Sequence, residues 1–102
     1  MARAGHYAVV VAPSALAQME SALDWWAANR EKAPGLLARE IEVALALIEH
    51  APNSGRRVAN KLLRGVRRLV LQRTGYLLDY QLVESDREVR VVHFRQGRRR
   101  PR

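Results

Sequence analysis

The sequence predicts an α+β domain in which a helical hairpin packs on a mainly antiparallel sheet with a basic outer face. Two segments in the first half of the chain have apolar residues at helical spacing. Three short runs in the second half are rich in β-branched, aromatic and other apolar residues, as strands are. A further run of this kind precedes the helices, so the predicted order is strand, helix, helix, strand, strand, strand.

The composition is that of one globular domain. A chain of 102 residues with 48% hydrophobic and 27% charged residues can bury a core of its own. It contains no cysteine, which excludes a disulfide framework, a thiolate metal site and a cysteine nucleophile, and which suits a reducing cytoplasm. No apolar run approaches the roughly 20 residues that span a bilayer, so we expect no membrane insertion.

Positive charge is concentrated in the second half. Residues 1–50 carry four Lys and Arg against six Asp and Glu, whereas residues 51–102 carry fourteen against four, which gives the net charge of +8. We expect a single domain over residues 1–97 and a basic tail over residues 98–102. Arginine offers a planar, permanently charged fork, so this half should meet polyanions or carboxylates.

The first predicted strand leads directly into a helix. Residues 6–11 form a short apolar run that predicts a strand covered on both faces. Pro13 suits the first helical turn, because the N–H that it lacks would have no helical partner there. The helix should run to about residue 29, and its predicted core stripe is Leu16, Met19, Leu23 and Trp26.

A second amphipathic helix follows the breaker at Pro34 and Gly35. Its apolar face consists of Leu37, Ile41, Ala44 or Leu45, and Ile48. The loop at residues 51–55 ends it. Because the link between the helices is short, they should form an antiparallel hairpin whose apolar faces pack on each other and on the sheet.

The remaining strands are predicted at residues 66–71, 76–83 and 89–94. Short polar links separate them, so neighbouring strands should pair antiparallel as a meander. In the middle run the alternate residues are apolar, which places the helices on that face of the sheet. These residues, among which we expect Tyr80 to belong to the core, are Tyr76, Leu78, Tyr80 and Leu82.

Several local motifs accompany this order of elements. They are Ala12-Pro13-Ser14-Ala15-Leu16, Trp25-Trp26, Arg64-Gly65-Val66-Arg67-Arg68, Tyr76-Leu77-Leu78-Asp79-Tyr80 and Val91-Val92-His93-Phe94-Arg95-Gln96-Gly97-Arg98-Arg99. In this order they resemble the RelE/ParE superfamily of small toxins from bacterial type II toxin-antitoxin systems, over nearly the whole chain. The ending, a His after an apolar strand and then Gly-Arg-Arg, is more similar to the ParE-like members.

The resemblance implies a cytoplasmic toxin with the β-α-α-β-β-β RelE/ParE-like fold. It also implies a cognate antitoxin, ParD-like or similar, whose C-terminal segment wraps over the toxin in a hetero-oligomer. ParE-like members poison DNA gyrase and have no known catalytic site, whereas RelE-like members cut mRNA in the ribosomal A site. We expect inhibition of gyrase, with ribosome-dependent mRNA cleavage as the alternative, and we expect no cofactor and no metal.

The chain offers few residues for catalysis. Metal-free RNA cleavage needs a base, an acid and cations that hold the phosphate. If the chain is a nuclease, the candidate catalytic residues are His93, Arg64, Arg67 and Arg95. RelE-like nucleases usually place a tyrosine just after the last strand, where this chain has Phe94, which could still stack on a base. We therefore lean towards a protein that acts by binding.

Two interpretations of His93 are open. Its unperturbed pKa of about 6.5 suits a general acid or base at cytoplasmic pH. By strand alternation, however, it shares a face with Val89 and Val91, which favours a partly buried histidine that is hydrogen-bonded to the sheet.

The arginines and one tryptophan are candidates for contacts with partners. Because adjacent strand residues point to opposite faces, only one of Arg67 and Arg68 should lie outside, and we favour Arg67 or Arg64 for the role that faces a ligand. Trp25 lies off the core stripe, so it could anchor a partner or pack under the first strand. Candidate contacts with the target or with nucleic acid are Arg64, Arg67, Arg90, Arg95, Arg98 and Arg99. Candidate antitoxin contacts are Trp25, Arg67, Arg68 and Arg73.

Overall fold

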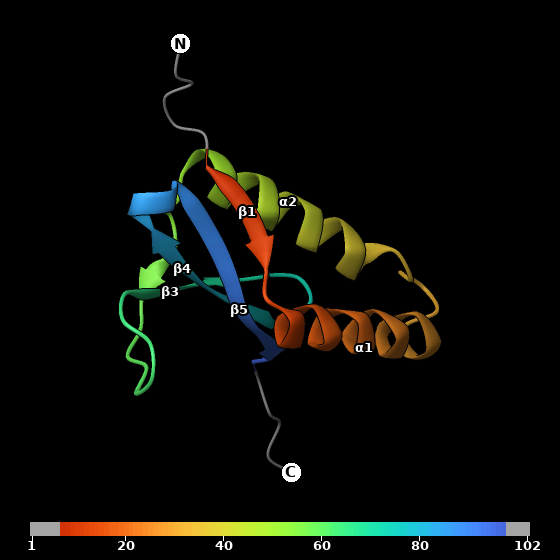
Figure 1. Cartoon of the computed structure of the whole chain (residues 1–102). Helices are drawn as coiled ribbons and strands as arrows, with labels where there is room; N and C mark the ends of the chain where they lie inside the picture. The colour runs from red at the N-terminus through yellow and green to blue at the C-terminus, as the bar shows by residue number, and fades with distance from the viewer. Residues whose placement is uncertain (1–6, 98–102) are drawn as a thin grey trace.

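A computed structural model describes residues 7–97 as a five-stranded sheet with both helices on one face (Figure 1). The elements are β1 (Ala8–Val11), α1 (Pro13–Asn29), α2 (Leu36–His50), β2 (Arg56–Arg57), β3 (Val66–Val70), β4 (Tyr76–Val83), the short 3₁₀ helix η1 (Glu84–Asp86) and β5 (Glu88–Gln96). The sheet order is β1-β5-β4-β3-β2, with β1 parallel to β5 and the other neighbours antiparallel. The predicted fold class and meander are confirmed, and β2 is an addition.

The two helices cover the sheet with their predicted faces, with one difference. The α2 core residues are as predicted, with Ala44 rather than Leu45 buried. On α1, however, Leu16 is 46% exposed, and the buried residues include Ala15 and Ala22. Short side chains let α1 lie close to β5, so the helix turns its alanines inward and Leu16 outward. Neither helix is long and apolar enough to cross a membrane.

The first strand lies at an edge of the sheet. We expected it to be covered on both faces, which is wrong: Ala8 and Val10 are exposed, whereas Val9 and Val11 are half-buried. The helices cover only one face of the sheet, so alternate β1 residues face solvent (Figure 1).

A β-bulge in β5 changes which residues face the core. Asp79 of β4 pairs with His93 and Tyr80 pairs with Val91, so Val92 is an extra residue in β5. The extra residue shifts the alternation by one position. Val91 is fully buried on the helix face, while His93 is exposed on the outer face, so the expectation that the two share a face is wrong.

The same bulge turns Phe94 into the core. Its side chain is 1% exposed and its ring stacks on Tyr76, with ring centroids 5.2 Å apart and planes 7° apart. The amide of Phe94 donates a hydrogen bond to Gln18 of α1, with N and Oε1 2.9 Å apart. The expectation that Phe94 could stack on a nucleic-acid base is therefore wrong, because the ring is enclosed by the protein itself.

Tyr80 fixes the loop after α2 to the sheet, and its predicted place in the core is confirmed. Its hydroxyl donates to the carbonyl of Pro52 at 2.7 Å and accepts from the amide of Gly55 at 2.8 Å. From the same face of the sheet, Arg67 Nη1 donates to the carbonyl of Gly55 at 2.7 Å and to that of Asn53 at 3.2 Å. These bonds hold the segment that leads into β2.

Candidate functional site

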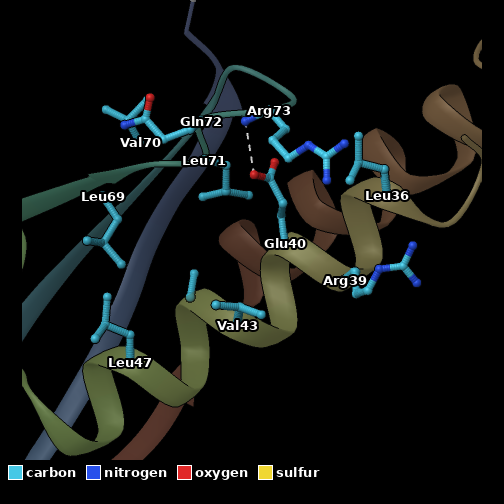
Figure 2. Close-up of a pocket in the computed structure, with 11 residues that line it drawn as sticks. Leu36, Arg39, Glu40, Val43, Leu47, Leu69, Val70, Leu71, Gln72 and Arg73 are labelled. Atoms are coloured by element: carbon cyan, nitrogen blue, oxygen red, sulfur yellow. Dashed lines mark hydrogen bonds between the residues drawn. The ribbon is translucent and has the colours of Figure 1, made fainter.

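A groove with a volume of about 360 Å³ lies between α2 and the end of β3 (Figure 2). Two of its apolar side chains, both on α2, are exposed: Val43 at 66% and Leu47 at 42%. Val70 of β3 also borders the groove, but it lies two residues after Arg68 and beside Leu77, so its side chain is on the outer face of the sheet. The remaining lining residues are Leu36, Arg39, Glu40, Ala44, Leu69, Leu71, Gln72 and Arg73. Exposed apolar side chains gathered along one groove are typical of a protein-binding surface.

The groove exists because β2 is short. Its two residues pair only with Arg67 and Arg68, so on the side away from β4 the residues of β3 beyond Arg68 have no strand neighbour. On the other wall, Val43 and Leu47 lie one helical turn apart and outside the buried stripe of α2. Within residues 7–97, no other element covers the α2 side or the β3 side of the groove.

Glu40 holds one end of the groove together. Its carboxylate accepts hydrogen bonds from the Arg73 amide at 3.0 Å, from the Thr74 amide at 3.0 Å and from the Thr74 hydroxyl at 2.8 Å. These bonds dock the β3–β4 turn on α2, so the side chains of Arg73 and Arg39 both lie at the end of the groove near Leu36 (Figure 2). The groove is therefore apolar along its length and cationic at one end.

The outer face of the sheet carries a second group of polar residues. Arg68 donates two hydrogen bonds to Asp79, which is buried, and these bonds raise the pKa of the guanidinium although burial opposes the shift. Register places His93 beside Asp79 and Arg56 beside Arg68 in one row across the sheet. His93, Arg56 and the neighbouring Arg95 are exposed. The exposed arginines of this face can attract anions, but the carboxylate in this row, that of Asp79, is already bound to Arg68.

The structure distributes the predicted arginines over several surfaces. Arg67 lies on the helix face and donates to the loop carbonyls, so Arg68 is the member of that pair on the outer face and the preference for Arg67 is wrong. Arg90 is half-buried and bound to Glu88. Arg64 is exposed in the loop that precedes β3. The predicted contacts therefore do not form one continuous site.

Trp25 is exposed on α1, close to the hairpin loop. The guanidinium of Arg30 lies over its ring at 5.2 Å from the centroid, and over the ring of Trp26 at 5.4 Å. Trp25 is thus available to anchor a partner, which was one of the two roles predicted for it, rather than packed under the first strand. Arg98 and Arg99 lie outside the described residues.

The tyrosines of the chain are all placed away from His93. Tyr76 and Tyr80 are buried on the helix face, and the hydroxyl of Tyr7 faces Glu84 at 3.4 Å. Residues 7–97 contain no group of three His, Asp or Glu side chains that could hold a metal. In this part of the chain, His93 is therefore an exposed acid–base group without a tyrosine beside it.

Comparison with known protein families decides the affiliation. Residues 9–101 match the family described as the ParE toxin of type II toxin-antitoxin system, parDE. This chain belongs to that ParE toxin family. The match includes both helices, every strand of the sheet beyond Ala8, and the groove. A search of curated protein sequences found no match.

Solved structures share the fold of this ParE-family chain. The chromosomal ParDE system from P. aeruginosa aligns with a TM-score of 0.72 and 16% identity over 93% of this chain and 100% of that one. The isolated E. coli RelE toxin gives 0.65 and 15% over 92% and 87%. The RelBE2 complex from Mycobacterium tuberculosis gives 0.65 and 18% over 92% and 94%. At such identities the likeness shows the fold alone.

The groove of this ParE-family chain was not predicted from its sequence. Val43 and Leu47 are apolar and one turn apart, yet they lie off the stripe that faces the core. That apolar surplus was a usable signal for a binding surface. The hydrogen bonds by which Glu40 holds the β3–β4 turn could not be predicted from local sequence, because its partners lie more than 30 residues away.

Proposed function

We propose that this ParE-family toxin inhibits DNA gyrase by binding to it, and that a cognate antitoxin neutralises it in the cytoplasm. The main support for action by binding, rather than by cleavage, is that Phe94 is buried in the core, where its ring stacks on Tyr76. A nuclease would need a ring or a second acid–base group beside His93, and the described tyrosines are engaged elsewhere. The family match supports the toxin, and the choice of gyrase is our inference.

A second candidate function is ribosome-dependent mRNA cleavage. One observation favours it: His93 is exposed on the outer face, next to the exposed Arg95, rather than buried. A histidine and an arginine could move a proton and stabilise a phosphate. The same row of the sheet offers no free carboxylate as a partner, because Asp79 is held by Arg68.

Two assays separate these functions. We expect the purified chain to inhibit negative supercoiling by gyrase, and we expect His93→Ala to inhibit it within about twofold of the unchanged chain, since less than 0.5 kcal/mol of binding would be lost. Primer extension on mRNA translated in the presence of the toxin should show no position-specific cuts. Cuts that disappear in His93→Ala, with gyrase unaffected, would establish the nuclease instead.

The groove between α2 and β3 is the site that we propose for the antitoxin. Its exposed Val43 and Leu47 would receive apolar side chains, and Arg39 and Arg73 at its end would pair with Asp or Glu of the antitoxin. Trp25 on α1 would supply a further anchor along the helical hairpin. Such a complex would combine apolar burial with a salt-sensitive ionic contribution.

A further inference from the structure

The loop at residues 58–65 presents one leucine to solvent. Leu62 is 90% exposed, more than any other large hydrophobic side chain in residues 7–97. Figure 1 shows this loop, coloured green between β2 and β3, extending from the sheet on the side away from the two helices. Single exposed apolar residues are common on protein surfaces, so the surroundings of Leu62 decide whether it has a role.

Hydrogen bonds within the loop and from the sheet hold the loop in place. The side-chain oxygen of Asn60 accepts from the amides of Leu62 and Leu63, both at 2.8 Å. At the base, the Val58 amide donates to the Val66 carbonyl at 3.0 Å, and Gln81 Nε2 donates to the Arg64 carbonyl at 3.0 Å. Leu62 is therefore presented by an ordered turn, which lowers the entropy that a partner would have to remove on binding.

The charges around Leu62 are of one sign. Lys61 and Arg64 flank it and are exposed, and Arg57 at the start of the loop is exposed as well. Residues 55–78 contain no Asp or Glu, so the sequence supplies no local carboxylate to neutralise them. A leucine with cations on both sides is complementary to an apolar pocket with an acidic rim.

We infer that loop 58–65 is a second interaction surface of this toxin, separate from the groove, and that it binds an acidic protein surface. Leu62 would enter an apolar pocket, and Lys61 and Arg64 would pair with carboxylates at its rim. The loop enters β3 at one end and the groove lies at the other, roughly 16 Å away along five residues. This inference rests on the proposal that the toxin acts by binding a protein target, and it assigns the contact with that target.

A protein is the favoured partner because of the chemistry at the tip. Binding to single-stranded nucleic acid uses aromatic rings for stacking on bases, and residues 55–65 contain none. The cations of the loop could attract the phosphates of a duplex, but such contacts give Leu62 no role. A leucine could act only as a wedge between bases, which requires a bent duplex. An aliphatic side chain in a protein pocket needs no such deformation.

The test compares Leu62→Gln with Leu16→Gln, a matched change of an exposed leucine on α1. Burial of a leucine at an interface corresponds to roughly 10- to 100-fold in affinity. We expect Leu62→Gln to raise the toxin concentration for half-inhibition of gyrase at least about 10-fold, and Leu16→Gln to change it less than about twofold. Thermal unfolding and antitoxin affinity of Leu62→Gln should equal those of the unchanged chain.

Growth arrest on expression without antitoxin separates this inference from the proposed function. If the unchanged chain arrests growth without inhibiting gyrase, the gyrase proposal fails, and loss of arrest in Leu62→Gln would still support the loop as the target contact. The inference would be overturned if Leu62→Gln still arrested growth and inhibited gyrase as the unchanged chain does. It would also be overturned if weaker antitoxin binding were the only defect of the Leu62→Gln protein. Loss of binding to a DNA or RNA duplex in parallel with loss of arrest would assign the loop to nucleic acid and overturn it too. An unchanged chain with neither activity overturns both proposals.

Discussion

Arg68 and Asp79 form an ion pair with two hydrogen bonds on the outer face of the sheet. Nε lies 2.7 Å from Oδ1 and Nη2 lies 3.0 Å from Oδ2, in the parallel arrangement that suits a guanidinium and a carboxylate. The Asp79 side chain is 6% exposed and that of Arg68 is 20% exposed. The pair therefore belongs to the interior of the protein more than to its surface.

Removal of the carboxylate should be costly. Asp79→Ala leaves the guanidinium of Arg68 without its buried partner, and we expect a loss of about 3 kcal/mol in the free energy of unfolding, the lower end of the usual range because Arg68 is partly hydrated. Urea unfolding measures it. The control is Glu88→Ala, which breaks the more exposed pair with Arg90 and should cost less than about 1 kcal/mol. Equal losses would show that Arg68 is as well solvated as Arg90.

The hydroxyl of Tyr80 should contribute strongly to stability. Tyr80→Phe leaves the Gly55 amide and the Pro52 carbonyl without their buried partner, so we expect a loss of about 1–3 kcal/mol in urea unfolding. Tyr7→Phe is the matched control, because that hydroxyl makes only an exposed contact of 3.4 Å, and it should cost under about 0.5 kcal/mol. A Tyr80→Phe protein as stable as the control would mean that water replaces the hydroxyl.

Tyr76 should make the fold sensitive to alkali. Burial raises the pKa of its phenol above the usual value of 10.0, and the charge of Arg30 opposes this only in part. The folded state thus holds the proton more tightly than the unfolded state, so this contribution to stability is complete below pH 10 and is lost as the pH rises through the folded-state pKa. Urea unfolding at several alkaline pH values should show a shallower decline for Tyr76→Phe. An identical decline would contradict the assignment.

The antitoxin affinity should depend on Val43 and on salt. Val43→Gln places a polar group in the groove, and we expect about 10-fold weaker antitoxin binding by calorimetry, with Leu16→Gln unchanged as the control. Raising NaCl from about 0.05 to 0.5 M should weaken the complex without dissociating it, because apolar contacts are not screened. Arg73→Ala should reduce that salt dependence. An affinity that does not change with salt would exclude pairing by the arginines.

Periodicity predicted the helices and the long strands correctly, since it reports which residues are apolar at a given spacing. Periodicity failed where tertiary contacts change which residues of an element face the core. Leu16 was expected in the core, but the close approach of α1 to β5 selected Ala15 instead. Residues 6–11 were expected to be covered on both faces, but an apolar run does not show whether its strand is central or at an edge.

By itself, the sequence determined the α+β class, the basic second half of the chain and the resemblance that the match over residues 9–101 confirmed. Only the tertiary structure decided the faces of His93 and Phe94, because one extra residue at Val92 reverses strand alternation and depends on the pairing with β4. It also decided the groove, which needs a β2 too short to cover β3. Local patterns record the preference of each residue, whereas register and edges arise only when distant segments pair.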